Sequence, residues 1–379
     1  MVLDNIVIAS DSFKESLTAK QACESINNGI LEVIPGANVM MIPMADGGEG
    51  TVQALVDSTS GKLVAVRVHD PLGREIESFF GLLGDHKTAI IEMAAASGIE
   101  LLKNSEKDPM ITSSFGTGEL IHAALDEGCR KIILGIGGSA TNDGGAGMIQ
   151  ALGAQLLDEK GNELKPGGTY LKQLQDIKLD DLDPRLKSTS FIVASDVDNP
   201  LLGENGATKI FGPQKGADKL KIEILEKDLE HFANITESFL GKKFRDHPGA
   251  GAAGGLGFSA LAFLNANLNP GFDVVAKLTS LEESIKKADL VITGEGKLDA
   301  QTRHGKTPFG VAQLAKKYNI PVIAFAGKTD IKSIELYKDD FIEIIQIVSA
   351  KISLQEAMEN ASDLLCNAAT KTIRKYFHR

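Results

Sequence analysis

The amino-acid sequence predicts an α/β protein with two α/β domains, one of which is a Rossmann-like parallel-sheet domain formed by both chain ends. Strand-like and helix-like patterns alternate over the first ~70 residues and again over the last ~90, which is typical of a parallel sheet. The stretch between them opens with a hairpin pattern instead. We therefore expect one domain from residues 1–67 and 288–379, with a second α/β domain, residues 68–287, inserted in it; a single continuous N-terminal domain is the alternative.

The N-terminal alternation can be followed element by element. Residues 6–9 are apolar and predict a buried strand. Thr18 and Gln21 have the spacing of a capping box, which predicts the start of a helix. Residues 38–42 then predict a second strand, and residues 46–58 predict a polar loop followed by a helix.

The middle of the chain begins differently. Two strand-like runs at residues 62–68 and 75–83 flank an Asp-Pro-Leu-Gly turn signal, and this combination predicts a hairpin. Residues 131–136 and 190–194 predict further strands.

The C-terminal part returns to strands that alternate with helices. Its strand-like runs lie at residues 289–293, 321–326 and 341–348. Thr307 followed by Pro308 has the pattern of an N-cap and the first residue of a helix. Ser353 and Glu356 predict the capped start of one last amphipathic helix.

Composition and charge exclude several classes of protein. Lys and Arg number 40 and Asp and Glu number 51, so the net charge is −11, which disfavours binding to the phosphate backbone of nucleic acids. The three cysteines form no C-x-x-C pair, which argues against zinc ribbons and disulfide frameworks and favours a reducing compartment. No segment approaches the ~18 apolar residues of a membrane span. We expect a cytoplasmic protein with no nucleic-acid or membrane partner.

Ligands of α/β sheets bind outside the carboxyl ends of the strands, so the polar loops after the predicted strands are the candidate sites. Asp11, Ser12 and Lys14 follow the first strand, where a lysine beside a carboxylate can balance phosphate. Asp46 and Glu49 lie in a glycine-rich loop before a helix, where Mg²⁺ between the carboxylates would let phosphate bind. A plain surface turn and ordinary helix capping are the alternative explanations.

A third loop, residues 135–145, is rich in glycine and polar side chains. Its candidate ligand-binding residues are Gly137, Gly138, Ser139, Thr141, Asn142 and Asp143. The loop formally matches a dinucleotide fingerprint, with Asp158 at the distance of a ribose contact, so an NAD-dependent dehydrogenase of a small hydroxy acid is one alternative. A carboxylate at the start of the next helix would face the pyrophosphate, however. The residues therefore better suit a Mg-phosphate group or a polyhydroxy substrate, unless they only form a capped turn.

The remaining loops contribute acids, one lysine and more glycine. Asp196 and Asp198 follow a predicted strand and could bind metal or supply a base, or form an ordinary turn. Lys215 is a candidate partner of phosphate or carboxylate, and Glu295 adds an acid after a strand. The glycines of residues 249–257 indicate either tight backbone packing or close approach of a ligand, and the sequence does not separate the two.

Two standard signatures are missing. The Gly-Lys-Thr triplets at residues 305–307 and 327–329 lack the leading glycine of a P-loop. No G-x-S-x-G nucleophile elbow is present either. The polar loops together favour phosphate and magnesium chemistry on a small polar substrate.

Six segments of the sequence resemble those of the bacterial glycerate kinases of class I. They are residues 11–17, 46–51, 137–145, 196–201, 211–216 and 293–296. They follow one another in the order of that family, and the resemblance extends over nearly the whole chain. The resemblance implies an ATP- and Mg²⁺-dependent kinase of D-glycerate, acting at the 2-hydroxyl, with two α/β domains and a cleft between them. It further implies a role in glyoxylate, glycolate or aldarate breakdown.

Within this resemblance we infer roles for the candidate residues. Asp196 is the expected base that accepts the proton of the glycerate hydroxyl. The expected ligands of Mg²⁺ are Asp46, Glu49 and Glu295. Lys14 and Lys215 would balance phosphate charge. The residues expected to bind substrate or phosphate are Asp11, Ser12, Gly137, Gly138, Ser139, Thr141, Asn142 and Asp143. The substrate carboxylate needs a cation, for which Arg67, Arg74 and Arg303 are open choices.

A non-catalytic protein that binds sugar acids is a second alternative, beside the dehydrogenase. The sequence leaves the oligomeric state open.

Overall fold

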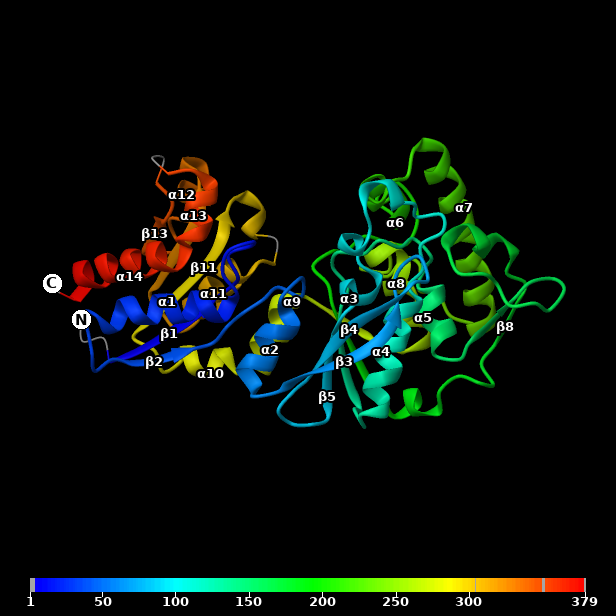
Figure 1. Ribbon diagram of the computed structural model, residues 1–379, viewed down its shortest axis with the longest axis horizontal. Helices are drawn as coiled ribbons and strands as arrows, with labels where there is room; N and C mark the ends of the chain where they lie inside the picture. Colours follow the sequence, from blue (N-terminus) through cyan, green and yellow to red (C-terminus); the bar gives the residue numbers. More distant parts are fainter. Residues whose placement is uncertain (1–3, 304, 350–351, 378–379) are drawn as a thin grey trace. The chain divides into compact units, whose positions relative to one another are not determined.

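The computed structural model describes residues 4–303, 305–349 and 352–377 and confirms the predicted α/β class (Figure 1). Contacts divide the chain into two compact units. Residues 1–46, 53–59 and 270–379 form the first unit, and residues 47–52 and 60–269 form the second. Both chain ends therefore belong to the first unit. The compact units are defined by contacts, whereas the boundaries expected at 67/68 and 287/288 describe domains that fold independently. Those boundaries stay a prediction.

The first unit contains a five-stranded sheet in which each strand runs parallel to its neighbours. Its strands are β1 (Asn5–Ser10), β2 (Asn38–Met41), β11 (Leu290–Leu298), β12 (Val322–Thr329) and β13 (Glu343–Gln346). They lie in the order β13-β12-β11-β1-β2. The strand pattern of the two chain ends therefore predicted this sheet correctly. β1 is buried along nearly its whole length, as its continuous apolar run requires.

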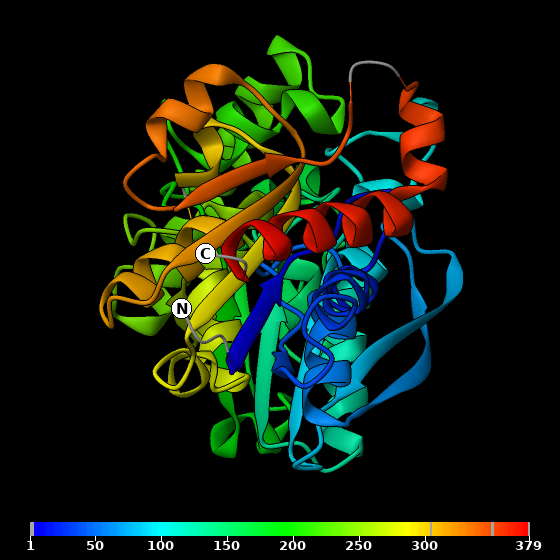
Figure 2. The ribbon, with the colours of Figure 1, turned by 90° about the vertical axis from the view of Figure 1, so that its left-hand side faces the viewer.

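The helices of the first unit pack on this sheet. They are α1 (Ala19–Leu31), α9 (Gly271–Leu278), α10 (Leu281–Ile285), α11 (Thr307–Lys316), α12 (Ile331–Leu336), α13 (Leu354–Glu359) and α14 (Ala361–Phe377). The predicted capping box of Thr18 and Gln21 is confirmed at the start of α1. α1 and α14 share a core with β1 and β11, and α14 lies across the viewer's side of the sheet in Figure 2.

The end of the chain differs from the single helix that the sequence predicts. Ser353 caps α13 by accepting a hydrogen bond from the backbone N–H of Glu356, but α13 ends at Glu359. Asn360 leaves the helical conformation at φ −106°, and its side-chain amide donates to the Glu356 carbonyl. Asparagine competes for backbone groups in this way, which breaks the amphipathic run into two helices.

The second unit contains a six-stranded mixed sheet in the order β10-β9-β6-β5-β4-β3. Its strands are β3 (Lys62–His69), β4 (Glu75–Leu82), β5 (Thr88–Glu92), β6 (Lys131–Gly135), β9 (Ser190–Ala194) and β10 (Asn267–Asn269). β3 and β4 form the predicted antiparallel hairpin, while β5, β6, β9 and β10 are parallel. A separate two-stranded ribbon joins β7 (Gln155–Leu157) to β8 (Asp176–Lys178).

Helices complete the second unit. They are α3 (Ala94–Ser97), α4 (Phe115–Asp126), α5 (Ala146–Ala151), α6 (Ala207–Phe211), α7 (Lys219–Leu240) and α8 (Ala252–Phe263). α2 (Thr51–Thr59) begins in this unit and continues into the first. Within the described residues, no helix is long and apolar enough to cross a membrane.

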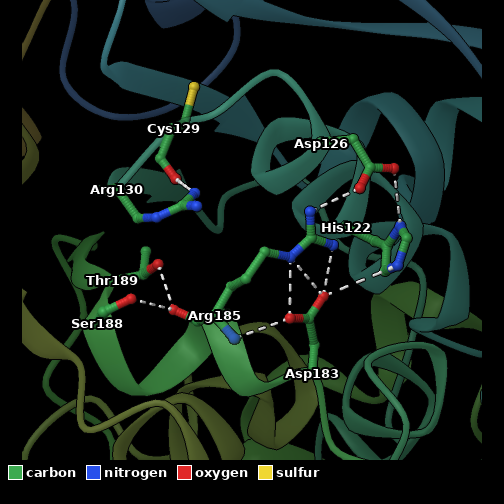
Figure 3. A network of polar contacts seen from close by, with 8 residues as sticks. All are labelled: His122, Asp126, Cys129, Arg130, Asp183, Arg185, Ser188 and Thr189. Atoms are coloured by element: carbon green, nitrogen blue, oxygen red, sulfur yellow. Dashed lines mark hydrogen bonds and ion pairs between the residues drawn. The ribbon is translucent and has the colours of Figure 1, made fainter.

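An arginine joins two elements at the edge of the second unit (Figure 3). The Arg185 guanidinium donates to the Asp183 carboxylate at 2.6 Å and to the Asp126 carboxylate at 2.7 Å. The His122 ring lies beside the same two acids. This network ties the end of α4 to the loop before β9. Arg185 is held by both acids, so we assign the network a structural role.

The glycines of residues 249–257 serve backbone packing, which answers the question left by the sequence. Ala253, Gly254 and Gly255 all have left-handed φ angles at the start of α8. The Gly254 carbonyl accepts a hydrogen bond from the Gly144 N–H at 3.0 Å. A Cβ atom at Gly254 would lie 1.9 Å from the Thr141 carbonyl oxygen. These two loops therefore touch backbone to backbone.

This contact predicts a large cost for Gly254→Ala. The matched control is Gly241→Ala, because Gly241 has nearly the same φ angle (65° against 68°) but open space around its Cβ position. The control should lose about 1 kcal/mol of stability, the cost of a left-handed alanine. Gly254→Ala adds the collision with Thr141 and should lose about 3 kcal/mol or more. Scanning calorimetry of both variants measures this, and equal losses would contradict the packing role.

Candidate functional site

The first unit brings three of the predicted acids onto or just after three neighbouring strands, β11, β1 and β2. Ser10 of β1 lies in register with Gly294 of β11, so Asp11 and Glu295 follow on neighbouring strands. The Asp11 N–H donates to the Gly294 carbonyl at 2.9 Å. Asp46 follows β2, the other neighbour of β1. The parallel sheet thus explains why acids distant in sequence act on one another.

Asp11 accepts hydrogen bonds from two donors, yet the ionised form of its carboxyl group is disfavoured. Its carboxylate accepts hydrogen bonds from the Ser12 N–H at 2.6 Å and from the Thr307 hydroxyl at 2.7 Å. Burial, together with the charge of Asp46, nevertheless raises the pKa of Asp11 to about 7. Thr307 was predicted as a helix N-cap, but Lys306 holds that position and Thr307 is the first residue of α11. Its hydroxyl is thereby directed to Asp11.

Glu295 is the second buried acid of this cluster. Its carboxylate accepts a hydrogen bond from the buried Thr302 hydroxyl at 2.7 Å. Burial raises the pKa of Glu295 to about 7, and the charge of Asp11 adds to this, although Lys306 opposes it. Two interacting acids of raised pKa favour the binding of a cation. Thr302 and Thr307 were not among the residues selected from the sequence.

Ser12 and Lys14 lie in the loop after β1. Ser12 is half-buried, whereas Lys14 is exposed. Glycine suits position 296, because a Cβ atom there would lie a tight 3.3 Å from the Lys14 backbone nitrogen. Gly296 of β11 therefore lets this loop approach the neighbouring strand.

The acids do not form a complete metal cage. Within the described ranges, no group of three or more His, Cys, Asp or Glu side chains is placed to hold a metal ion. Asp46 and Glu295 belong to the first unit, while the exposed Glu49 belongs to the second. The raised pKa values of Asp11 and Glu295 still fit a divalent cation. This donor set suits Mg²⁺, which takes one or two carboxylates together with substrate phosphates and water.

In the second unit, Asp143 organises the loop between β6 and α5. Its buried carboxylate accepts hydrogen bonds from the Ser114 N–H and hydroxyl, both at 2.8 Å, and from the N–H groups of Gly145 and Gly147. Four donors occupy this carboxylate. The contacts of its side chain hold the loop to the start of α4, and its predicted role in binding substrate or phosphate stays a prediction.

Lys215 is buried against the same loop. Only 1% of its surface is exposed, and its ammonium group donates to the Ser139 hydroxyl and to the Thr141 carbonyl, both at 2.7 Å. Burial lowers the pKa of Lys215 to about 7, which the charge of Asp143 opposes only in part. The structure therefore brings together Lys215, Ser139 and Thr141, which the sequence predicted separately.

Two further polar atoms of this loop lack partners. The Thr141 hydroxyl and the Asn142 side-chain oxygen are buried and have no hydrogen-bond partner among the described residues. The Asn142 amide nitrogen donates to the Thr208 hydroxyl at 3.0 Å. Buried polar atoms are nearly always paired in folded proteins, so unpaired ones mark a place where a ligand can bind.

The backbone of residues 137–138 stays accessible beside these side chains. Gly137 and Gly138 are both exposed, and Gly138 has a left-handed φ of 70°. A Cβ atom at Gly137 would lie 3.5 Å from Gly48, so the loop before α2 runs alongside. The exposed backbone of Gly137 and Gly138 thus adjoins Ser139 in this loop, and the cradle for phosphate or substrate stays a prediction.

The anion site predicted at the start of α2 is filled by the protein itself. Glu92, at the end of β5, accepts a hydrogen bond from the Val52 N–H at 2.8 Å. Burial raises the pKa of Glu92, as does the charge of Glu49, while the N–H groups of residues 50–52 lower it. A protein carboxylate thus occupies the helix N-terminus that the sequence suggested for phosphate. Glu92 was not selected, because only the strand order of the folded sheet brings it there.

The other candidates lie at different places. Asp196 and Asp198 are exposed in the loop after β9, as a residue acting on a substrate at a strand end would be. Arg74 is bound to Asp70 at 2.5 Å and to Glu106 at 2.9 Å. Arg67 is exposed on β3, and the side chain of Arg303 lies outside the described residues.

Comparison with known proteins agrees with the sequence resemblance. A family model described as the glycerate kinase family matches residues 6–377. The chain is 52% identical over 360 residues to a glycerate kinase of Bacillus subtilis (strain 168), covering 95% of this chain and 94% of the relative. It is 49% identical over 364 residues to a glycerate 2-kinase of Escherichia coli (strain K12), covering 96% of each.

A solved structure is similar throughout. The crystal structure of a Salmonella typhimurium LT2 protein assigned as glycerate kinase 2 matches with a TM-score of 0.92 and 45% identity. The match covers 100% of this chain and 99% of the other.

The buried amine predicts how stability responds to Lys215→Met. The pKa of Lys215 is about 7 in the folded protein, against the ordinary value of 10.5 expected in the unfolded chain. Between these two pH values the unfolded chain therefore binds more protons than the folded protein. Stability of the wild type therefore rises with pH in this window. Relative to Lys215→Met, the free energy of unfolding of the wild type should therefore increase by about 2 kcal/mol from pH 7 to pH 9.

Chemical denaturation at the two pH values measures this difference. Lys209→Met is the control, since Lys209 pairs on the surface with Glu204, which raises its pKa and keeps it charged throughout the window. If the difference in unfolding free energy between the wild type and Lys215→Met is the same at both pH values, the buried amine does not titrate between pH 7 and pH 9.

Proposed function

The chain belongs to the glycerate kinase family and is a kinase, and we propose that it transfers the γ-phosphoryl group of ATP to the 2-hydroxyl of D-glycerate, giving 2-phosphoglycerate. The observation that carries this proposal is the pair of strand-end clusters with opposite chemistry. The first unit gathers the half-buried Asp11 and the buried Glu295, which suit a metal–nucleotide. The second gathers Lys215 and hydroxyl groups, which suit a small polar anion.

Mg²⁺ is the proposed cofactor beside ATP. Asp46, Glu49 and Glu295 are its proposed ligands, with substrate phosphates and water completing the coordination. The ion would neutralise charge that develops on the phosphoryl oxygens. Lys14 in the first unit would balance the remaining negative charge of the phosphates, and Lys215 in the second would balance the charge of the small anionic substrate.

The chain's own residues would then position the substrates and remove one proton. Asp196 is the proposed base for the glycerate hydroxyl, because it is exposed in the loop after a central strand. Asp11 and Ser12 in the first unit, and the loop from Gly137 to Asn142 in the second, are the proposed contacts of phosphate and substrate. Asp143 would act by holding that loop in place.

The choice of the 2-hydroxyl is supported by the E. coli relative, which is named a glycerate 2-kinase. We further propose a cytoplasmic enzyme of glyoxylate, glycolate or aldarate breakdown, as the sequence resemblance implies. Family membership favours this function over a dehydrogenase or a non-catalytic binding protein.

The direct test is ADP release from ATP with D-glycerate, with and without Mg²⁺. We expect turnover with both, loss of turnover after chelation by EDTA, and recovery when Mg²⁺ is restored. Phosphorus NMR of the product should show 2-phosphoglycerate. Absence of ADP release in the presence of Mg²⁺ would reject the kinase proposal, and 3-phosphoglycerate as product would reject the 2-hydroxyl.

The base is tested by Asp196→Asn. Removal of a general base typically lowers the rate ~10²–10⁴-fold, so kcat should fall by that amount. Asp198→Asn is the matched control, because it makes the same exchange two residues further along the exposed loop and should change kcat less than ~3-fold. Unchanged kcat for a folded Asp196→Asn protein, measured in the coupled assay, would remove Asp196 from this role.

A further inference from the structure

The buried amine of Lys215 has no acidic side chain in direct contact to stabilise its charged form. Among the described residues it forms no ion pair, and its two partners are a hydroxyl and a carbonyl, Ser139 and Thr141. Asp143 is the charged group that acts on it, but its carboxylate is occupied by Ser114 and two glycine N–H groups. A buried charge without a counter-ion is costly, and an anionic ligand would offset that cost.

The ammonium group also decides what Ser139 can bind. The Ser139 oxygen accepts a hydrogen bond from Lys215, so its own O–H is available as a donor. No acceptor for that O–H lies among the described residues, and Ser139 keeps 8% of its surface exposed beside Gly137 and Gly138. The unpartnered Thr141 hydroxyl adds a second donor in the same loop. These donors require a ligand that presents acceptors.

Charge decides which anion fits best. A triphosphate carries several negative charges and is normally bound together with a metal ion. Two acids near this loop are engaged by the protein itself: Asp143 holds the loop, and Glu92 accepts the N–H of Val52 at the start of α2. One lysine acting through one serine matches the single negative charge of a carboxylate. The acids suited to a metal–nucleotide, Asp11 and Glu295, lie in the other unit.

We propose that Ser139, held by Lys215, binds the carboxylate of the three-carbon hydroxy-acid substrate, and that Lys215 is a positioning residue acting through Ser139. This inference rests on the proposed function and assigns the substrate end that Arg67, Arg74 and Arg303 were candidates to bind. Lys215 balances the acid's charge and orients the Ser139 hydroxyl. The carboxylate would accept hydrogen bonds from that hydroxyl and from the exposed amides of Gly137 and Gly138.

The test compares a charged ligand with an uncharged analogue of the same shape. Calorimetric titrations with D-glycerate and with D-glyceramide, which replaces the carboxylate by an amide, are run on the full chain with Mg²⁺ and a non-hydrolysable ATP analogue. Wild type should prefer glycerate. Lys215→Met should weaken glycerate binding about 10- to 100-fold, the value of a charge-assisted hydrogen bond, and leave glyceramide and the ATP analogue nearly unchanged.

A second readout separates positioning from a general structural effect. At pH 8 the bound carboxylate should draw a proton onto Lys215, so glycerate binding should take up close to one proton in wild type. Titrations in buffers of different ionisation enthalpy measure this, and the uptake should disappear in Lys215→Met. Ser139→Ala should weaken glycerate binding while leaving Lys215 in place, and Lys209→Met, which removes a surface charge of the same unit, should change neither quantity.

Two results would overturn the inference. One is undiminished preference for glycerate in a folded Lys215→Met protein, and the other is weaker binding of the ATP analogue with unchanged glycerate binding. Both are distinct from failure of the proposed function, which would appear as absence of ADP release by the wild type. Melting temperatures of each variant confirm folding.

Discussion

The backbone contact between the loop after β6 and the start of α8 is the constraint on which the second unit's site depends. The Gly144 N–H donates to the Gly254 carbonyl, and the Ser259 hydroxyl donates to the Gly144 carbonyl at 2.5 Å. The contact is possible because Gly144, Gly254 and Gly255 have left-handed φ angles and no side chains. It fixes residues 141–145, so that Asp143 reaches α4 and the Thr141 carbonyl reaches Lys215.

Both units store buried charge at the ends of their parallel strands. In the first unit, burial raises the pKa of Asp11 and of Glu295, and repulsion between acids on neighbouring strands raises it further. In the second, burial lowers the pKa of Lys215, because its partners are neutral. Such groups are costly in the protein alone, and ligands of opposite charge relieve the cost. This is the arrangement expected of an enzyme whose substrates bring their own charges.

Much of the fold could be predicted from local pattern. The strands of the first unit, the β3–β4 hairpin and the capping box at Thr18 depend on neighbouring residues, and all are confirmed. The prediction was wrong at two places where the same local sequence pattern is compatible with more than one structure. Thr307 resembled an N-cap but donates to Asp11, and the C-terminal helix breaks at Asn360. In both places the side chain found a partner that sequence spacing does not reveal.

The sequence by itself determined the alternation of strands and helices, the polar loops that follow the strands, and the family to which the chain belongs. Tertiary structure alone decided which of those loops meet. Only strand order brings Glu92 to the start of α2, where it takes the place suggested for phosphate. Only folding brings Lys215 to Ser139 across 76 positions of the sequence. The physical reason is that the pKa of a side chain, and whether a polar atom finds a hydrogen-bond partner, depend on burial and on residues distant in the sequence. No local sequence pattern contains this information.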